Sequence, residues 1–203
     1  MAKKRTGLTR QGEATRNAII AAAEKHFALQ GFAATRLEDI ADDANIRAAT
    51  LLYYFSSKQA LYDEMDKAIF LSAEALITSY LANCSSPHDR LVGLINAWLD
   101  FLVSRPTAAR IYQRNLAGSS MQHPPREFSG PAKERFVSII RDGQASSAFK
   151  DINPGHILYI IGGGIVNFVC LETWNNNSIP EQAIASFRKT LHSLAHSPLA
   201  TPE

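Results

Sequence analysis

The chain has 203 residues, of which 46% are hydrophobic and 20% charged, so it can bury one large core or two smaller ones and is neither disordered nor fibrous. The two distant cysteines, Cys84 and Cys170, argue against a disulfide framework or a structural zinc site. Net charge is only +2, but residues 1–61 carry nine Lys and Arg against six Asp and Glu. That basic N-terminal part indicates either a polyanion partner or a solubilising tail.

The first residues, MAKKRTGLTRQGE, are basic and lead into no apolar stretch, so we expect no secretory signal. We predict a flexible basic arm over residues 1–12. The longest apolar run, residues 157–171, contains Asn167 and is too short to cross a bilayer comfortably. We therefore expect a cytoplasmic protein with no membrane contact.

Apolar residues recur at spacings of three and four almost throughout, which predicts an all-α chain. Three short helices come first, over residues 15–30 with a stop at Gly31, over 37–44, and from Arg47 to Tyr53 or Tyr54. A long fourth helix begins near Ser57, whose hydroxyl can cap the free N–H groups, and ends near Leu81.

The remaining helices are predicted to form a bundle of about five or six. Pro87 suits the first turn of a helix that ends near Ser104, and Pro106 starts another that ends near Leu116. A stretch rich in Gly, Ser and Pro then predicts a loop over residues 117–131. Further helices are expected over residues 131–146, 154–174 and 180–196, before a frayed tail over 199–203.

Residues 36–55 have the proportions of a helix-turn-helix, in which the second helix enters the major groove of DNA. Asn45 stands in the turn, where the backbone must tolerate a left-handed conformation. Ala41 is small enough for the two helices to approach closely. Ile40, Ile46 and Leu51 can fill the space between them.

The sequence of residues 15–61, TRNAIIAAAEKHFALQGFAATRLEDIADDANIRAATLLYYFSSKQAL, resembles the DNA-binding domain of the TetR/AcrR family of transcription regulators. The order and spacing of the family pattern hold over this whole segment. The resemblance implies an N-terminal helix-turn-helix domain, joined by the long fourth helix to a C-terminal helical bundle. We place the DNA-binding domain at residues 13–73 and the ligand-binding and dimerisation domain at 74–198.

Several positions depart from the family pattern. Asn45 stands where glycine is usual, and Tyr54 where histidine is frequent. Arg47 replaces serine and removes an N-cap hydroxyl, at a cost of roughly 1 kcal/mol, but adds a long cation where the reading helix begins. Arg36, where threonine is common, does the same one helix earlier. Both arginines favour contact with phosphate or guanine.

The expected DNA-binding residues are therefore Arg36, Arg47, Ala48, Ala49, Thr50, Tyr53, Tyr54 and Lys58. Lys58 and the Tyr54 hydroxyl would meet phosphates. The small side chains would let the helix approach the base edges. Arg47 either reads a base or contacts only phosphate, and Tyr53 either contacts DNA or packs under the fourth helix. Phe55 is expected in the core.

Resemblance to the family implies a homodimer that binds a palindromic operator and pairs its last two helices, near 154–174 and 180–196. Candidate interface residues are Gly162, Gly163, Gly164, Phe187 and Leu191. Three glycines in a helix cost about 1 kcal/mol each relative to alanine. They indicate close approach of another helix, room for a ligand, or a kinked buried helix.

The family also implies a small effector that releases the protein from DNA. The candidate lining is aromatic apart from one amide: Phe70, Trp98, Phe101, Tyr112, Phe136, Tyr159, Asn167, Phe168 and Trp174. Aromatic residues at helical spacing also suit an ordinary core. Because few charges fall on these apolar faces, a bound effector would be mainly apolar.

Two other functions compete with an effector-controlled regulator. The chain could bind DNA constitutively or architecturally without an effector. Alternatively, ILYIIGGGIVN could run from a strand into the glycine turn of a nucleotide-binding enzyme, but no β-α alternation surrounds it. His192 and His196 have metal-ligand spacing but no matching acidic third ligand. We expect no enzyme activity, no cofactor and no metal site.

Overall fold

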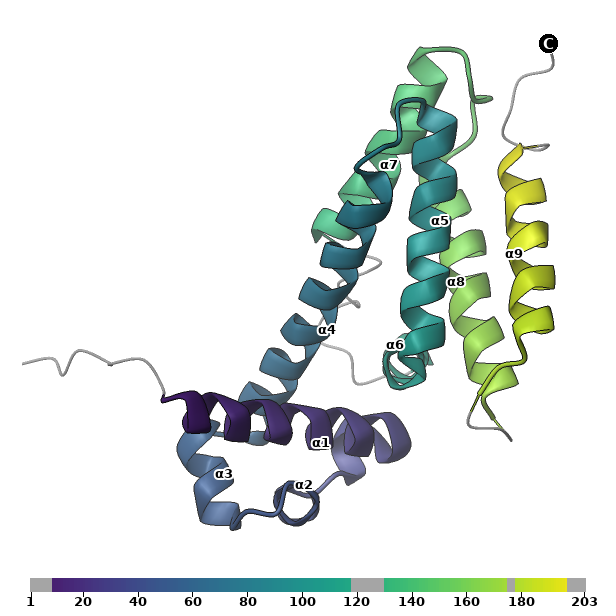
Figure 1. The fold of residues 1–203 in the computed structure, drawn as a ribbon. Coiled ribbons are helices and arrows are strands. Elements are labelled where there is room, and N and C mark those ends of the chain that lie inside the picture. The colour runs from purple at the N-terminus through teal and green to yellow at the C-terminus, as the bar shows by residue number, and fades with distance from the viewer. Residues whose placement is uncertain (1–8, 118–129, 175–177, 197–203) are drawn as a thin grey trace, which may run out of the picture. The chain divides into compact units, whose positions relative to one another are not determined.

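The structure is a computed structural model that describes residues 9–117, 130–174 and 178–196. These residues form nine helices and no strand (Figure 1). Their bounds are α1 Arg10–Ala34, α2 Leu37–Asp43, α3 Ala48–Tyr54, α4 Lys58–Leu81, α5 Pro87–Ser104, α6 Pro106–Ala117, α7 Gly130–Ala145, α8 Pro154–Glu172 and α9 Glu181–His196. The predicted all-α fold is confirmed. The predicted tail and most of the predicted 117–131 loop lie outside the described residues.

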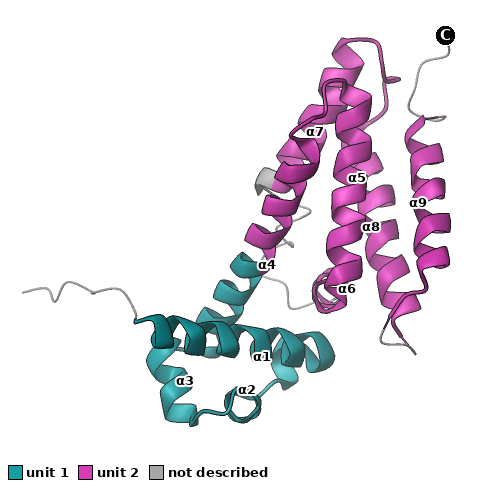
Figure 2. Cartoon of the chain, in the orientation of Figure 1, with its two compact units in different colours: residues 1–68 teal, residues 69–203 magenta. Residues whose placement is uncertain are grey.

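The chain divides into two compact units, residues 1–68 and 69–203 (Figure 2). The division falls inside α4, a few residues before the end of the predicted 13–73 domain. Helix α1 begins at Arg10, so the last residues of the predicted 1–12 arm are helical.

Unit 1 folds around α1, which Thr9 caps by accepting a hydrogen bond from the Gly12 N–H at 3.2 Å. The regular helical backbone ends at Gly31, as predicted, because Gly31 has a φ of 79°. A further turn follows it and ends at Ala34. The apolar side chains of Ile19, Phe27 and Leu61 are almost completely buried. Each such burial stabilises the fold by about 1.5–3 kcal/mol.

The turn between α2 and α3 has the predicted conformation, since Asn45 adopts a φ of 54°. The Ile46 N–H then donates to the Ala41 carbonyl at 3.0 Å, which closes the turn. Ile40 and Leu51 are fully buried between the helices, as predicted. The predicted cap of α4 is also confirmed, because the Ala60 N–H donates to the Ser57 hydroxyl at 3.1 Å.

Unit 2 is a bundle in which α5 and α8 each contact several other helices (Figure 1). Helix α5 starts with a capping box of Ser86 and Asp89, followed by Pro87 in the first turn. In the described chain, α8 alone is long and apolar enough to cross a membrane, with mean hydropathy 1.6, and it packs against α5, α6 and α7. Because α8 is helical through its glycines, the predicted alternative of a strand and nucleotide-binding turn is wrong.

A polar seam joins α5 to α9. Arg188 forms an ion pair with Asp100, and its other guanidinium nitrogen donates to the Asn96 oxygen at 2.9 Å. His192 Nε2 also contacts that oxygen, at 2.8 Å. At the far end of the seam, His88 Nε2 lies 3.0 Å from His196 Nε2.

We expect acid to weaken this seam. Burial, and then the charges of His196 and His192, lower the pKa of His88 from 6.5, against an opposing effect of Asp89. Burial, followed by Arg188 and His196, also lowers the pKa of His192. Below about pH 6.5 the unfolded chain therefore binds more protons than the folded one, so the free energy of unfolding falls as pH falls. Urea unfolding at about pH 7.5 and about pH 5.5 measures this loss.

The variant His196→Gln tests whether the His196 charge contributes to the lowered pKa of His88 and His192. Removing the His196 charge should make the pH dependence of unfolding shallower without abolishing it, because burial of the other two histidines remains. Equal pH dependence in the wild type and the variant would contradict this account.

Candidate functional site

The two arginines that begin α2 and α3 differ in their surroundings. Arg36 and Arg47 each occupy an N-cap position without making a side-chain cap hydrogen bond, as expected from the loss of a hydroxyl. Arg36 lies 3.6 Å from Glu38, which offsets part of its charge. The Arg47 side chain is exposed and makes no ion pair or hydrogen bond within the described part of the chain. Arg47 is therefore the more available cation for an anionic partner.

The following turns of α3 present small and aromatic side chains. Ala49 is exposed, whereas Ala48 and Thr50 are half-buried. Tyr53 is 80% exposed and meets the half-buried Tyr54 edge to face, with ring centres 5.4 Å apart. Tyr53 therefore does not pack under α4. Two phenol hydroxyls consequently lie near the end of α3.

Phe55 turns inward instead, as predicted. It is 3% exposed, and the Arg16 guanidinium lies 5.3 Å from its ring centre. Arg16 also pairs with Glu64 on α4. Phe55 and Arg16 thus hold the end of α3 against α1 and α4.

Lys58 has partners that the sequence did not reveal. Its ammonium donates to the carbonyl oxygens of Ala33 at 3.2 Å and Thr35 at 3.0 Å. It also lies 4.7 Å from the ring centre of Phe32. These contacts tie the first residue of α4 to the end of α1. An ammonium has three donors, so about one donor remains for a phosphate.

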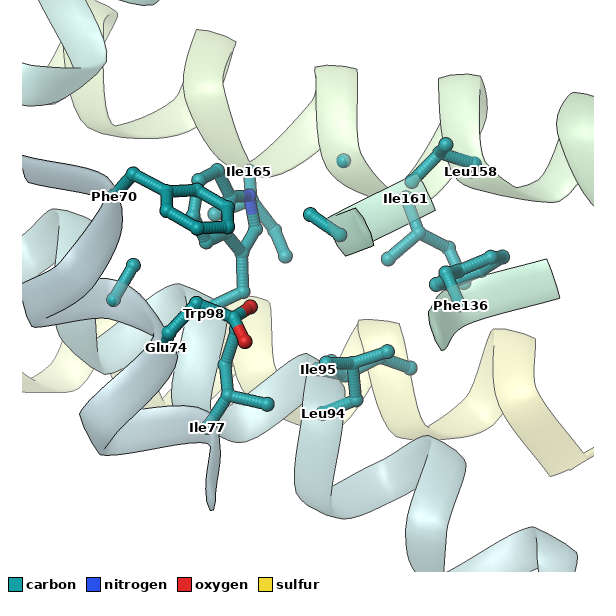
Figure 3. A pocket seen from close by; sticks show the side chains of 13 residues that line it. Phe70, Glu74, Ile77, Leu94, Ile95, Trp98, Phe136, Leu158, Ile161 and Ile165 are labelled. Atoms are coloured by element: carbon teal, nitrogen blue, oxygen red, sulfur yellow. The ribbon is translucent and has the colours of Figure 1, made fainter. Parts of the chain in front are cut away.

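Unit 2 contains a cavity between α4, α5, α7 and α8 (Figure 3). The centre of a water-sized sphere can move through about 60 Å³ inside it. Three of the nine predicted ligand-binding residues line it: Phe70, Trp98 and Phe136. The predicted set also omitted several aliphatic residues of the wall, including Leu94, Ile95, Leu158, Ile161 and Ile165.

The other six predicted ligand-binding residues lie elsewhere. Phe101 and Tyr112 are buried and do not line the cavity. Phe168 stacks on Phe187 with ring centres 4.1 Å apart. The remaining three are exposed, and among them Asn167 accepts a hydrogen bond from Gln113 at 3.3 Å, while Tyr159 and Trp174 are 55% and 77% exposed.

Sequence reasoning missed Glu74. This residue lies on α4 one turn after Phe70, and its carboxylate points into the cavity (Figure 3). The Arg135 guanidinium on α7 lies 2.7 Å from Glu74 Oε2. The spacing of Phe70, Glu74 and Ile77 could have indicated a shared face of α4, but not what faced it.

The glycines of α8 divide between two faces. Gly162 is buried and lines the cavity. Gly163 and Gly164 are partly exposed, and a Cβ atom at either position would meet nothing within 4 Å. The same outer face carries Ile160 and Leu171, which are 62% and 69% exposed. This exposed helix face is thus mainly apolar with a glycine depression, and Asn167 is a polar residue on it.

The predicted interface residues on α9 are less accessible. Leu191 is 2% exposed, and Phe187 is half-buried against Phe168.

Across the described ranges, no group of three His, Cys, Asp or Glu side chains is arranged to hold a metal ion.

Comparison with known proteins gives consistent matches. Residues 19–65 match the family model described as bacterial regulatory proteins, tetR family. The chain is 30% identical over 165 residues to the HTH-type transcriptional regulator RutR of Escherichia coli K12, covering 79% of this chain and 76% of RutR. It is 29% identical over 157 residues to the HTH-type transcriptional repressor NicS of Pseudomonas putida, covering 74% of each.

The fold extends beyond the helix-turn-helix in these comparisons. The ketosteroid transcriptional regulator KstR2 of Mycobacterium tuberculosis superimposes with a TM-score of 0.71 at 20% identity. The alignment covers 98% of this chain and 100% of that structure.

Proposed function

Because the chain belongs to the TetR family of bacterial regulatory proteins, we propose that it is a homodimeric repressor that leaves its operator when a small molecule occupies the cavity. It is a DNA-binding transcription regulator and not an enzyme. The repressor role is supported by relatives named as repressors, among them NicS. Such a regulator would work in the cytoplasm.

DNA reading by α3 is the central element of the proposal. The observation that carries it is the exposed, unpaired Arg47 at the start of α3, next to small side chains that allow a helix to enter the major groove. Tyr53, Tyr54 and the remaining donor of Lys58 would contact phosphates. Lys58 would then both shape unit 1 and bind DNA.

Selection of bound sequences from random DNA tests this reading. We expect the wild type to select a palindrome, and Arg47→Ala to relax preference at one base in each half-site. The loss at that base should be about 1–3 kcal/mol, the usual value of a bidentate base contact.

Arg36→Ala is the matched control, because it removes the same charge from an arginine that Glu38 already offsets. We expect Arg36→Ala to weaken binding to all sequences by the same factor, and that factor to be smaller than the loss caused by Arg47→Ala. If Arg47→Ala also weakens every sequence alike at fixed salt, Arg47 contacts only phosphate. If the wild type selects no sequence, the proposed function fails.

Dimerisation through α8 and α9 is proposed from the apolar outer face of α8. Ile160, Gly163, Gly164 and Leu171 are spaced so that a second helix could approach closely. A dimer would present two copies of α3 to two half-sites. Gly162 and Leu191 face their own protomer, so the proposed interface rests on the outer residues.

The cavity supports a small-molecule effector over a constitutive DNA-binding protein. Its wall is mainly apolar, as expected for an apolar effector. Part of that wall comes from α4, the helix whose first residues belong to unit 1. A ligand that contacts α4 would therefore act on the helix that both units share.

A further inference from the structure

The polarity of the cavity is concentrated in one carboxylate. Glu74 is the one charged side chain among the 13 described residues of the wall, and its side chain is 18% exposed. Arg135, its ion-pair partner, is not part of the wall and is 33% exposed. Arg135 thus contacts the carboxylate without lining the cavity. Figure 3 shows the Glu74 carboxylate facing inward.

Glu74 retains capacity for a second partner. A carboxylate can accept about four hydrogen bonds, and the ion pair with Arg135 places Nη2 of the guanidinium 2.7 Å from Glu74 Oε2. In an apolar cavity a carboxylate attracts a cation much more strongly than it would in water. A ligand carboxylate, in contrast, would be repelled by the Glu74 carboxylate. No described Lys, Arg or His side chain lines the wall to offset that repulsion.

The aromatic wall has the same preference. Phe70, Trp98 and Phe136 line the cavity together with Glu74. The faces of such rings attract organic cations, and tryptophan does so most strongly. Trp98 is fixed in place by stacking on Tyr112, with ring centres 5.6 Å apart. A fixed ring and a carboxylate in one cavity form a site for a cation.

We propose that the cavity binds a small organic cation, an amine or ammonium with an apolar body, whose charge competes with Arg135 for Glu74. This inference rests on the proposed function in that it assigns a ligand class to the same cavity. The available space, about 60 Å³ for the centre of a water-sized sphere, suits a single ring or a short chain. Occupation would weaken the tie between α4 and α7 that the ion pair provides.

Three probes of one shape test the inference on the full-length protein: benzylammonium, benzyl alcohol and benzoate. Binding is measured by titration at fixed salt and neutral pH, and ligand-detected NMR monitors each titration. We expect benzylammonium to bind at least about tenfold more tightly than benzyl alcohol, and benzoate to bind weakest. Glu74→Gln should reduce the preference for the cation to within about twofold.

Two further variants separate the site from general charge effects. Glu134→Gln removes the same charge from the exposed neighbour of Arg135 and should leave the cation preference intact. Arg135→Gln removes the competing guanidinium and should strengthen benzylammonium binding by about three- to tenfold.

Equal binding of benzyl alcohol, tighter binding of benzoate, no effect of Glu74→Gln, or no binding of any probe would each overturn the inference. Operator titration with and without benzylammonium is scored separately. If the cation binds through Glu74 but leaves operator affinity unchanged, the ligand class stands and the proposed effector role fails.

Discussion

Gly143→Ala is expected to destabilise unit 2 by about 2–4 kcal/mol, because a side chain at this position has no space. A Cβ atom there would lie 2.0 Å from the Phe149 ring, which is 3% exposed. The ring cannot move away freely. The N–H groups of Ala148 and Phe149 both donate to the Gly143 carbonyl, at 2.8 Å and 3.0 Å, and hold the chain back on α7. Urea unfolding of the wild type and the variant measures the loss.

The cause is isolated by a double-mutant cycle. Phe149→Ala alone should cost about 3–4 kcal/mol through the lost burial. Adding Gly143→Ala to Phe149→Ala should then cost less than about 1 kcal/mol, because the atoms that clash are gone. Additive losses would show that Gly143 is required for a reason other than the Phe149 ring.

Ile160→Asp is expected to abolish dimerisation and to weaken operator binding by a factor on the order of 100 or more, the usual gain from linking two binding modules. Ile160 is 62% exposed in the protomer, so the aspartate can remain in water and the fold should persist. In a symmetric interface the same change buries two unpaired carboxylates, each at a cost of several kcal/mol. Sedimentation and operator titration at fixed salt measure the two effects.

The control for this variant is Thr78→Asp on α4, which adds the same charge at an exposed position on a helix outside the proposed interface. We expect Thr78→Asp to remain dimeric and to bind the operator with close to wild-type affinity. A dimeric Ile160→Asp protein with unchanged circular dichroism would place the interface on another surface.

Local signals predicted most of the helix ends. Three helices, α5, α6 and α8, begin at a proline: Pro87, Pro106 and Pro154. The first turn of a helix is where the fixed φ of proline is best tolerated. Ser57 and Asn45 act through their nearest backbone neighbours. Such features involve only a few consecutive residues, so a sequence can reveal them.

The cavity could not be predicted in the same way. Helix α8 is apolar nearly all round, so its periodicity does not show which side faces inward. On this helix Tyr159 lies outside, whereas Ile161 and Ile165 line the wall.

The contacts of Lys58 were equally hidden from the sequence. They join residues more than 20 positions apart, and the carbonyl groups that accept them belong to the backbone. Backbone acceptors are present at every residue, so no sequence pattern marks the ones that a distant ammonium will reach.

Helix α4 runs unbroken from Lys58 to Leu81 across the division between residues 68 and 69. Limited proteolysis separates domains by cleaving exposed, flexible linkers, and this boundary offers only hydrogen-bonded helical backbone. A shortened gene that ends at the boundary would leave a frayed helix end close to Met65 and Leu61, both of which are fully buried. Isolating the DNA-binding half would therefore require keeping several residues of α4 that belong to the other half.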